Sequence, residues 1–420
     1  MMPRVVASLA GGLIVGALIA GCTAPAPLPT STPTLTPSAA PLGDGILRIG
    51  TLVPTTGTFA FIGAAQAAGV DLAVREINES GGFEGAPVEL VQRDSGDATT
   101  ATAEASFADL VTQITDVVIG PSSSVLAQRL IPLAAQERIP LISPAATFPA
   151  LTSQPGADYF FRTIPSYGEQ GTALGKVISN PTPQKVGLVY ADDELGKSIV
   201  PTLEQSLADG GSSLVASVPV LATTTDLDSL VAKVVKAKPD VVVLATAYSS
   251  LDSTLALMSK LIAAGFGGSK LWITTQNTGD YSQALPAGTL TGVNGIIEGY
   301  QPDDAFIARL KTSDSALIQF RYAAESYDAT ILAALAAVVT GDDSGPAIAS
   351  ALEQVSAGGI KCTTFAECLD VLKAGDDIDY DGVSGPVNFD SDGNISPAFY
   401  GLYTFNGENK FVFTAGIVTG

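Results

Sequence analysis

Short runs rich in β-branched residues alternate with longer helical runs through most of this chain of 420 residues. The run "ILRIGTLVP" (46–54) is followed by a helical run at 65–80, which Gly81 and Gly82 terminate. The runs "DVVIGP" and "PLISPAA" continue the series, and a second series of similar length begins after residue 165 and ends near "KLWITTQ". Apolar strands that are separated by helices form parallel sheets covered on both faces. The sequence therefore predicts an α/β protein with two doubly wound, Rossmann-like lobes, since the chain is too long for one typical core.

The pattern changes in the last third of the chain. Residues 303–375 are mostly helical in pattern, and the closing segments "GPVNFD" and "FYGLYTFNGENKFVF" alternate apolar and polar residues. The dipeptide Asn406-Gly407 inside the second segment is typical of a tight β-turn. We therefore expect the chain to close in a β-hairpin.

The N-terminus predicts an export signal in residues 1–21, because Arg4 precedes an apolar run that is short for a membrane span. The sequence "IAGC" at its end resembles the lipobox of bacterial lipoproteins, which implies cleavage before Cys22 and lipid on its sulfur. An ordinary buried cysteine is the alternative. Residues 22–44 are rich in Pro, Thr and Ser without apolar periodicity, so we expect a disordered tether. The expected location is extracytoplasmic, with a lipid anchor as the only contact with the membrane.

The remaining cysteines, Cys362 and Cys368, form an even pair in a protein expected to leave the reducing cytosol. This predicts a short-loop disulfide across "CTTFAEC". A metal-binding pair is the alternative, although no further soft ligand lies nearby in the sequence.

Composition excludes several function classes. The chain has no histidine, which removes His-based triads and His-ligated metal sites. The net charge of −21 argues against nucleic acid or an anionic membrane surface as the main partner. The G-x-S-x-G, G-x-x-x-x-G-K-[ST] and G-x-G-x-x-G motifs are absent, and we expect neither catalysis nor a cofactor.

One motif suggests a metal. Asp377, Asp379 and Asp381 have the spacing that opens an EF-hand loop, but the position of the closing glutamate is occupied by Asn388. A strand pattern also replaces the helix that should follow. The sequence favours a turn-rich crossover over a calcium site.

Two strand ends carry small and hydroxylated residues. "VVIGPSSS" (117–124) leads into a helical run, and "LISPAAT" (141–147) ends without a charged residue. Open α/β sheets bind ligands beyond the carboxyl ends of their strands. Ser124 is expected to be the N-cap of the helix that follows, where free N–H groups and hydroxyls would receive an anion such as a carboxylate. Capping and turn formation alone are the alternative explanation.

These segments resemble a known family. "TGTFAFIG", "AAGVDLAVREINESGGFEG", "IGPSSSVLA", "IPLISPAAT", "YADDELGKS" and "DGVSGPVNFDSDGN" follow, in order, the type 1 periplasmic binding proteins of the branched-chain amino acid kind. The resemblance covers nearly all of residues 46–413. It implies two lobes joined by three crossovers, with a ligand in the cleft between them. Lobe 1 is expected in residues 45–164 and 302–384, and lobe 2 in residues 165–301 and 385–420.

The resemblance assigns roles to individual residues. Ser124 matches the serine that holds the ligand carboxylate, Ala145 the residue whose carbonyl meets the ligand ammonium, and Thr147 the hydroxyl that binds the amino acid head. Other residues expected to line the site are Ser123, Phe61, Ile62, Leu195, Tyr248, Gln276 and Asn277.

Some of these positions depart from the family pattern. Ile62 and Leu195 stand where the family often has aromatic residues, and neither Gln276 nor Asn277 supplies the usual acid for an ammonium group. A site without that carboxylate is less suited to an α-ammonium. An amino acid, an amide or a short carboxylate therefore stays open as the ligand.

The resemblance implies a monomeric solute-binding lipoprotein that delivers a small polar ligand to an ABC permease and its ATPase subunits. A lipoprotein that senses the ligand on the same fold is the first alternative. A secreted α/β enzyme is the second.

Overall fold

The computed structural model describes residues 42–221, 223–246 and 251–419. Its first sheet is wholly parallel, in the order β2-β1-β3-β4-β5. The strands are β1 (Arg48–Val53), β2 (Glu89–Asp94), β3 (Val117–Ile119), β4 (Leu141–Ser143) and β5 (Phe160–Arg162). The first four come from the first of the two series recognised in the sequence, which confirms the parallel sheet predicted there, whereas β5 was not predicted.

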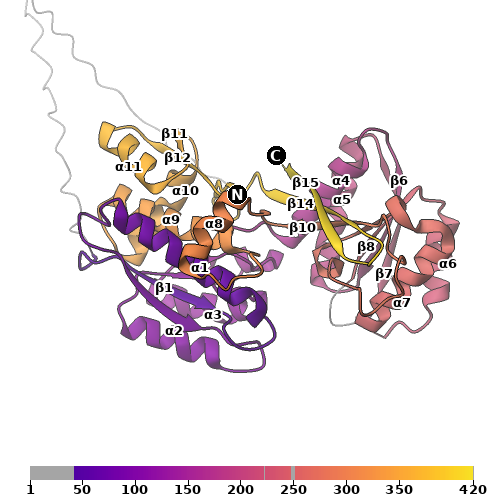
Figure 1. The fold of residues 1–420 in the computed structure, drawn as a ribbon, viewed down its shortest axis with the longest axis horizontal. Coiled ribbons are helices and arrows are strands. Elements are labelled where there is room, and N and C mark those ends of the chain that lie inside the picture. The colour runs from indigo at the N-terminus through magenta and orange to yellow at the C-terminus, as the bar shows by residue number, and fades with distance from the viewer. Residues whose placement is uncertain (1–41, 222, 247–250, 420) are drawn as a thin grey trace, which may run out of the picture. The chain divides into compact units, whose positions relative to one another are not determined.

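Helices cover both faces of the first sheet. In β3, Val117 and Ile119 face one apolar cluster while Val118 faces another, as the two-residue repeat of a strand requires. Helices α1 (Ala60–Glu79) and α9 (Ala323–Thr340) pack together on one side, and α2 (Thr102–Thr112) and α3 (Ser124–Glu137) on the other (Figure 1). The helices α8 (Asp304–Ser313), α10 (Gly345–Ser356) and α11 (Phe365–Ala374) complete the predicted helical region.

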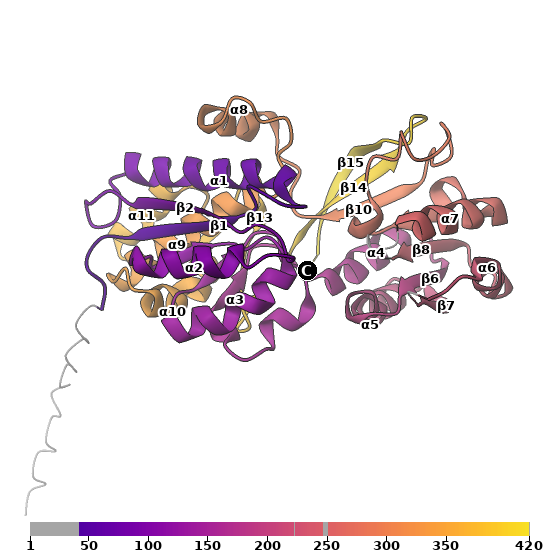
Figure 2. The ribbon, with the colours of Figure 1, turned by 90° about the horizontal axis from the view of Figure 1, so that it is seen from below.

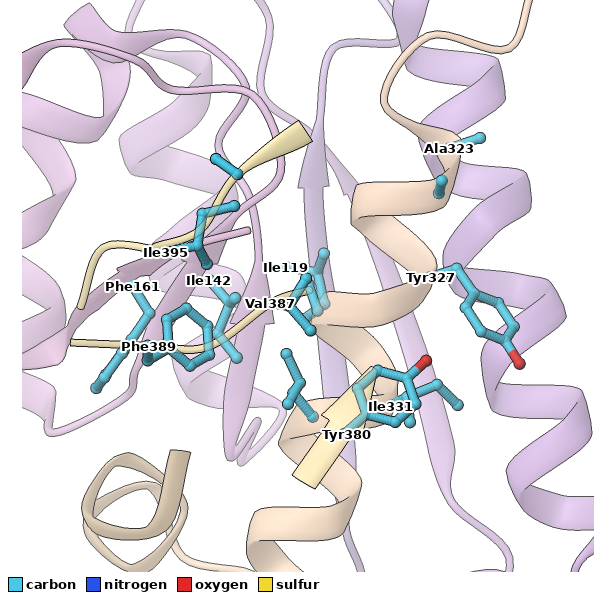
Figure 3. Packing of buried hydrophobic residues seen from close by; sticks show 14 of the residues in the cluster. Ile119, Ile142, Phe161, Ala323, Tyr327, Ile331, Tyr380, Val387, Phe389 and Ile395 are labelled. Carbon is cyan, nitrogen blue, oxygen red and sulfur yellow. The ribbon is translucent and has the colours of Figure 1, made fainter. Parts of the chain in front are cut away.

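Helix α9 is the core helix of this lobe. Within the part of the chain that the structure describes, it is the one helix long and apolar enough to cross a membrane, but 83% of its apolar window is buried in the protein. Figure 3 shows Ile331 of α9 beside Tyr380 and Ile119 of the sheet beside Val387, while Tyr327 of α9 points away from Ile119; all five belong to one apolar cluster. Its composition therefore reflects burial against the sheet and the later segments.

The second sheet has the order β15-β14-β10-β9-β8-β6-β7. Its parallel strands are β6 (Lys185–Ala191), β7 (Ser213–Val220), β8 (Val241–Ala245), β9 (Leu271–Ile273) and β10 (Asn294–Glu298). The covering helices are α4 (Gln170–Ile178), α5 (Glu194–Asp209), α6 (Leu227–Lys236) and α7 (Leu251–Leu261). Shorter helical turns are η1 (Pro149–Thr152), η2 (Ala157–Tyr159), η3 (Tyr167–Glu169), η5 (Ile262–Phe266), η6 (Gly268–Lys270) and η7 (Thr275–Asn277).

The predicted C-terminal hairpin is confirmed. Strands β14 (Phe399–Phe405) and β15 (Phe411–Val418) pair antiparallel, and β14 joins β10 at the edge of the second sheet (Figure 2). The chain thus passes between the two sheets three times: after β5, after β10 and before β14. This is the two-lobed α/β fold that the alternating pattern predicts.

A small third sheet contains Cys362 and most of the acidic run. It is formed by β11 (Ile360–Cys362), β12 (Ile378–Gly382) and β13 (Gly385–Pro386). The predicted disulfide joins Cys362 of β11 to Cys368 of α11, with an S–S distance of 2.00 Å.

The acidic run is paired with a lysine. It forms β12 and the turn to β13 instead of an irregular crossover, and Lys361 Nζ lies 3.2 Å from Asp379 Oδ2 and 2.8 Å from Asp381 Oδ2. Among the described residues, no group of three or more Cys, Asp or Glu side chains is arranged to hold a metal ion.

Residues 42–45 are attached to the first lobe, although the sequence analysis assigned residues up to 44 to the tether. The N–H groups of Leu42 and Gly43 donate to Asp342 at 2.9 and 3.1 Å, and the N–H of Gly45 donates to Asp343. Both acids lie in the turn between α9 and α10. The signal peptide, Cys22 and most of the predicted tether lie outside the described residues.

Candidate functional site

The two small-residue segments are neighbours because their strands are neighbours. β3 pairs with β4 in parallel, with Val118 opposite Leu141 and Ile119 opposite Ile142, so both strands end at the same edge. Gly120 turns the chain there with φ +126°, and an added Cβ would lie 2.3 Å from the carbonyl oxygen of Leu52. Only glycine fits this turn, because other residues rarely adopt that φ and would clash with β1.

Ser124 connects the two segments directly. Its Oγ accepts hydrogen bonds from the N–H groups of Thr147 at 3.0 Å and Phe148 at 3.2 Å. The prediction that Ser124 caps α3 is wrong: Ser123 is the N-cap residue, and no side chain caps the helix. The Ser124 hydroxyl is drawn across to the neighbouring loop instead, and its own proton is still available to donate to a ligand.

The uncapped start of α3 is suited to an anion. The first N–H groups of a helix have no partner within the helix, and the helix dipole adds partial positive charge at this end. Ser124 is the first residue of α3 and is half-buried at this edge of the sheet, as is Ser123. A carboxylate placed here would meet N–H groups and the Ser124 hydroxyl together.

The loop after β4 uses nearly all of its backbone groups internally. Ser143 Oγ donates to the Pro121 carbonyl at 2.7 Å and accepts from the N–H of Ala146 at 3.0 Å. The Thr147 carbonyl accepts from the N–H of Tyr167 at 2.8 Å. Among the described residues, the carbonyl of Ala145 and the hydroxyl of Thr147 make no hydrogen bond. These are the two groups that the family resemblance assigns to the ligand.

The first turn of α1 follows β1 at the same edge of the sheet. Ile62 is buried, whereas Phe61 is 60% exposed. Gln66, one turn later, accepts a hydrogen bond from the Ser122 hydroxyl, which places this end of α1 against the serine loop. Phe61 is therefore available to a ligand or a partner, while Ile62 belongs to the packing beneath.

In the second lobe, the predicted residues lie at the carboxyl ends of β6 and β9. Leu195 is half-buried in the first turn of α5, which Asp193 caps by accepting from the N–H of Gly196 at 2.7 Å. Gln276 is half-buried in η7. Tyr248 lies outside the described residues.

Asn277 is committed to the protein itself. It is 1% exposed, its Oδ1 accepts from the N–H of Thr246 at 2.9 Å, and its Nδ2 donates to the Thr246 hydroxyl at 3.0 Å. These bonds tie the end of β8 to η7. Asn277 therefore has a structural role that sequence position alone did not predict.

A buried acid at the same edge was missed by the sequence analysis. Glu298 at the end of β10 accepts a hydrogen bond from Gln170 Nε2 at 3.0 Å and another from the Thr275 hydroxyl. Burial raises the pKa of Glu298, and its side chain is enclosed by neighbours. The signal was an acid directly after an apolar strand in "GIIEGY", but its burial makes it a poor partner for a ligand ammonium.

The comparisons with known proteins agree with this arrangement. A family model described as periplasmic binding protein matches residues 46–400. The chemotactic signal transduction system substrate-binding protein BasB of Halobacterium salinarum is 26% identical over 360 residues, covering 81% of this chain and 82% of BasB.

Solved structures show the same fold. The branched-chain amino acid transporter substrate-binding protein LivJ of Streptococcus pneumoniae, in complex with isoleucine, has a TM-score of 0.63 and 24% identity, covering 89% of this chain and 99% of LivJ. A solute-binding protein of an ABC transporter from R. palustris, in complex with benzoate, has a TM-score of 0.59 and 21% identity, covering 90% of this chain and 97% of that protein. The family match extends over the first sheet, all three passages between the sheets, and the second sheet up to the start of β14. The chain therefore belongs to the periplasmic binding protein family, among its type 1, branched-chain amino acid-binding-like members.

Proposed function

We propose that this protein is an extracytoplasmic solute-binding lipoprotein that captures a small polar ligand in an interlobe cleft and delivers it to an ABC-type permease and its ATPase subunits. The observation that carries the proposal is the group of unused polar atoms at the ends of β3 and β4. The Ala145 carbonyl and the Thr147 hydroxyl make no hydrogen bond within the described residues, and they lie beside Ser124 at the uncapped start of α3. Buried or half-buried polar groups without partners are costly unless a ligand or water engages them.

A carboxylate is the ligand group that this arrangement favours. The Ser124 hydroxyl and the α3 amides are donors, and the isoleucine and benzoate held by the two structural relatives both carry a carboxylate. Only isoleucine carries an ammonium group as well. In the second lobe Gln276 is neutral, Asn277 is engaged with Thr246, and Glu298 is buried, so an ammonium is not required by the residues present.

A thermal-shift screen tests this function. We expect L-isoleucine, benzoate or another small carboxylate to raise the unfolding temperature, because a ligand at one hundred times its Kd stabilises the native state by about 2.7 kcal/mol. Matched amides and polyols are screened separately for comparison. A shift with polyols and none with any carboxylate or amino acid would contradict the proposed ligand class. Turnover of any compound by the pure protein would support the enzyme instead.

The sensing alternative has a specific observation in its favour, because BasB is named as part of a chemotactic signal transduction system. The proposed transport role and the sensing role use the same ligand site and differ in the membrane partner. Cross-linking of the ligand-loaded protein in its native membrane distinguishes them. We expect a permease to be captured; capture of a transducer alone would support sensing.

The lipid anchor is a separate part of the proposal. Labelled palmitate should enter the wild-type protein and not the Cys22→Ser variant, because the lipobox-like sequence places the acceptor sulfur at that residue. Equal labelling of both proteins would remove the anchor from the proposal. Deletion of residues 25–40 should leave ligand affinity unchanged, since the predicted tether precedes every residue of the candidate site.

A further inference from the structure

Arg162, the last residue of β5, has a buried guanidinium that holds the loop of the candidate site. The residue is 1% exposed. Its Nη1 donates to the carbonyl of Phe148 at 2.8 Å and to that of Ala146 at 3.4 Å. These two carbonyls flank Thr147, whose own N–H and carbonyl are bound by Ser124 and Tyr167.

The other side of the guanidinium binds a different segment. Arg162 Nε donates to Asn394 Oδ1 at 2.8 Å, and Nη2 donates to the same oxygen. Asn394 lies in the turn between β13 and β14, where the chain makes its third passage between the sheets. The backbone is tied at the same place, because the N–H of Arg162 donates to the Gly393 carbonyl at 3.0 Å.

No carboxylate of residues 42–221, 223–246 or 251–419 bonds directly to this buried cation. The negative charge of Asp390 favours the charged guanidinium from beyond hydrogen-bond distance, and Asp390 accepts from the N–H of Asn394 at 2.9 Å and from its Nδ2 at 3.4 Å. Burial lowers the pKa of Arg162 to about 10, so the side chain is still charged at neutral pH. Burying a charge in this way is costly unless every donor is used, and an apolar side chain would fill the space at lower cost. The charge is therefore explained by the carbonyls that it orients.

The orientation of those carbonyls determines which groups of the loop are left for a ligand. Arg162 draws the carbonyls of residues 146 and 148 toward β5, and Ser124 takes the intervening N–H groups. Within the described residues, the carbonyls of Pro144 and Ala145 and the hydroxyl of Thr147 are the groups of the loop that make no hydrogen bond. Arg162 Nη1 reaches both carbonyls, and among the side chains that the structure describes no other one bonds to residues 146 and 148 together.

We propose that Arg162 is a positioning residue that holds this loop in its ligand-receptive form and couples it to the crossover carrying Asn394. The inference rests on the proposed ligand role of the loop. Ligand bound at Thr147 then bears on the crossover segment through one side chain, because the same guanidinium contacts both. Asn394 is the partner residue on the crossover side.

Hydrogen–deuterium exchange tests the positioning without any ligand. In Arg162→Met, peptides covering residues 144–148 and 388–396 should exchange about tenfold faster than in wild type. The variant lacks the guanidinium hydrogen bonds that must break before these segments open. Arg162→Lys should recover part of the protection, since a lysine reaches one carbonyl. Asn394→Ala, which keeps the guanidinium, should loosen the crossover peptide more than the loop, and it serves as the second variant if Arg162→Met does not fold.

Val234→Ala, in the buried core of α6, is the stability-matched control. It should lower the unfolding temperature without selective exchange at residues 144–148. Unchanged exchange of that loop in Arg162→Met, or equal acceleration in Val234→Ala, would overturn the positioning role.

Calorimetry with L-isoleucine and with benzoate then tests the link to binding. If Arg162 acts through the loop, its replacement should weaken binding of the probe about tenfold in a wild-type background and by much less in a Thr147→Val background. Equal losses of affinity in both backgrounds would show that Arg162 does not act through Thr147. If neither probe binds to the wild type, the proposed ligand class fails, and the exchange experiment still decides whether Arg162 positions the loop.

Discussion

Replacement of Ser124 by alanine is expected to weaken ligand binding about 5- to 150-fold, which corresponds to about 1–3 kcal/mol. The Ser124 hydroxyl has two functions in the structure. It accepts the N–H groups of Thr147 and Phe148, and it can donate its own proton to a ligand carboxylate. Alanine removes both, so the ligand loses a donor and the neighbouring loop loses its attachment to α3.

Thr147 and Leu195 provide the comparison. Thr147→Val removes a hydroxyl that has no partner in the described part of the protein and keeps the branched shape, so it should also weaken binding within that range while leaving stability nearly unchanged. Leu195→Ala should cost less, or change the preference among ligands, because a half-buried leucine supplies contact area and no hydrogen bond. Calorimetry with the carboxylate that gives the largest thermal shift measures the order. If Ser124→Ala and Thr147→Val both bind with wild-type affinity, the ligand does not bind at these residues.

Replacement of Glu325 by glutamine is expected to make the free energy of unfolding fall less steeply as pH rises. Glu325 lies in α9 at 1% exposure, its Oε1 accepts from the N–H of Tyr300 at 2.6 Å, and its Oε2 has no partner in the described residues. Burial is the main cause that raises its pKa from 4.5 to about 8, and the nearby Asp328 adds to the shift while Arg321 opposes it.

The sign of the effect follows from these pKa values. Below about pH 4.5 the carboxyl is protonated in both the folded and the unfolded chain. Between pH 4.5 and about 8 the unfolded chain releases the proton while the folded protein retains it, so the free energy of unfolding falls as pH rises. One group contributes about 1.4 kcal/mol per pH unit, which gives about 3–4 kcal/mol between pH 5 and 8.

Urea denaturation of wild type and Glu325→Gln at pH 5 and pH 8 measures this difference. Glutamine keeps an acceptor for Tyr300, so the variant should gain stability relative to wild type at the higher pH. Asp116 and Asp328, whose pKa values burial raises to about 8 and about 6, leave a residual slope in the variant. Glu353→Gln, exposed on α10, is the matched control and should keep the wild-type slope. Parallel slopes for wild type and Glu325→Gln would mean that Glu325 is ionised in the fold.

The sequence predicted the features that depend on local pattern. Runs of apolar residues located the parallel strands, and Asn406-Gly407 located the hairpin between β14 and β15. The neighbouring ends of β3 and β4 could be predicted because strand ends in parallel sheets share an edge.

The contacts that organise the site were not predictable in the same way. Arg162 meets Asn394 across 232 positions, and Asn277 meets Thr246 across 31. No spacing in the sequence encodes these pairs, because they depend on how the loops pack after the sheets have formed. Ser124 was predicted to cap its own helix, but its hydroxyl points across to residues 147 and 148.

The attachment of residues 42–45 to the turn at Asp342 and Asp343 determines from which lobe the preceding part of the chain leaves the protein. The turn follows α9, so this part of the chain leaves from the first lobe. A force applied to the chain before residue 42 would therefore act first on the lobe that contains α9, and it would reach the second sheet only through the three passages of the chain.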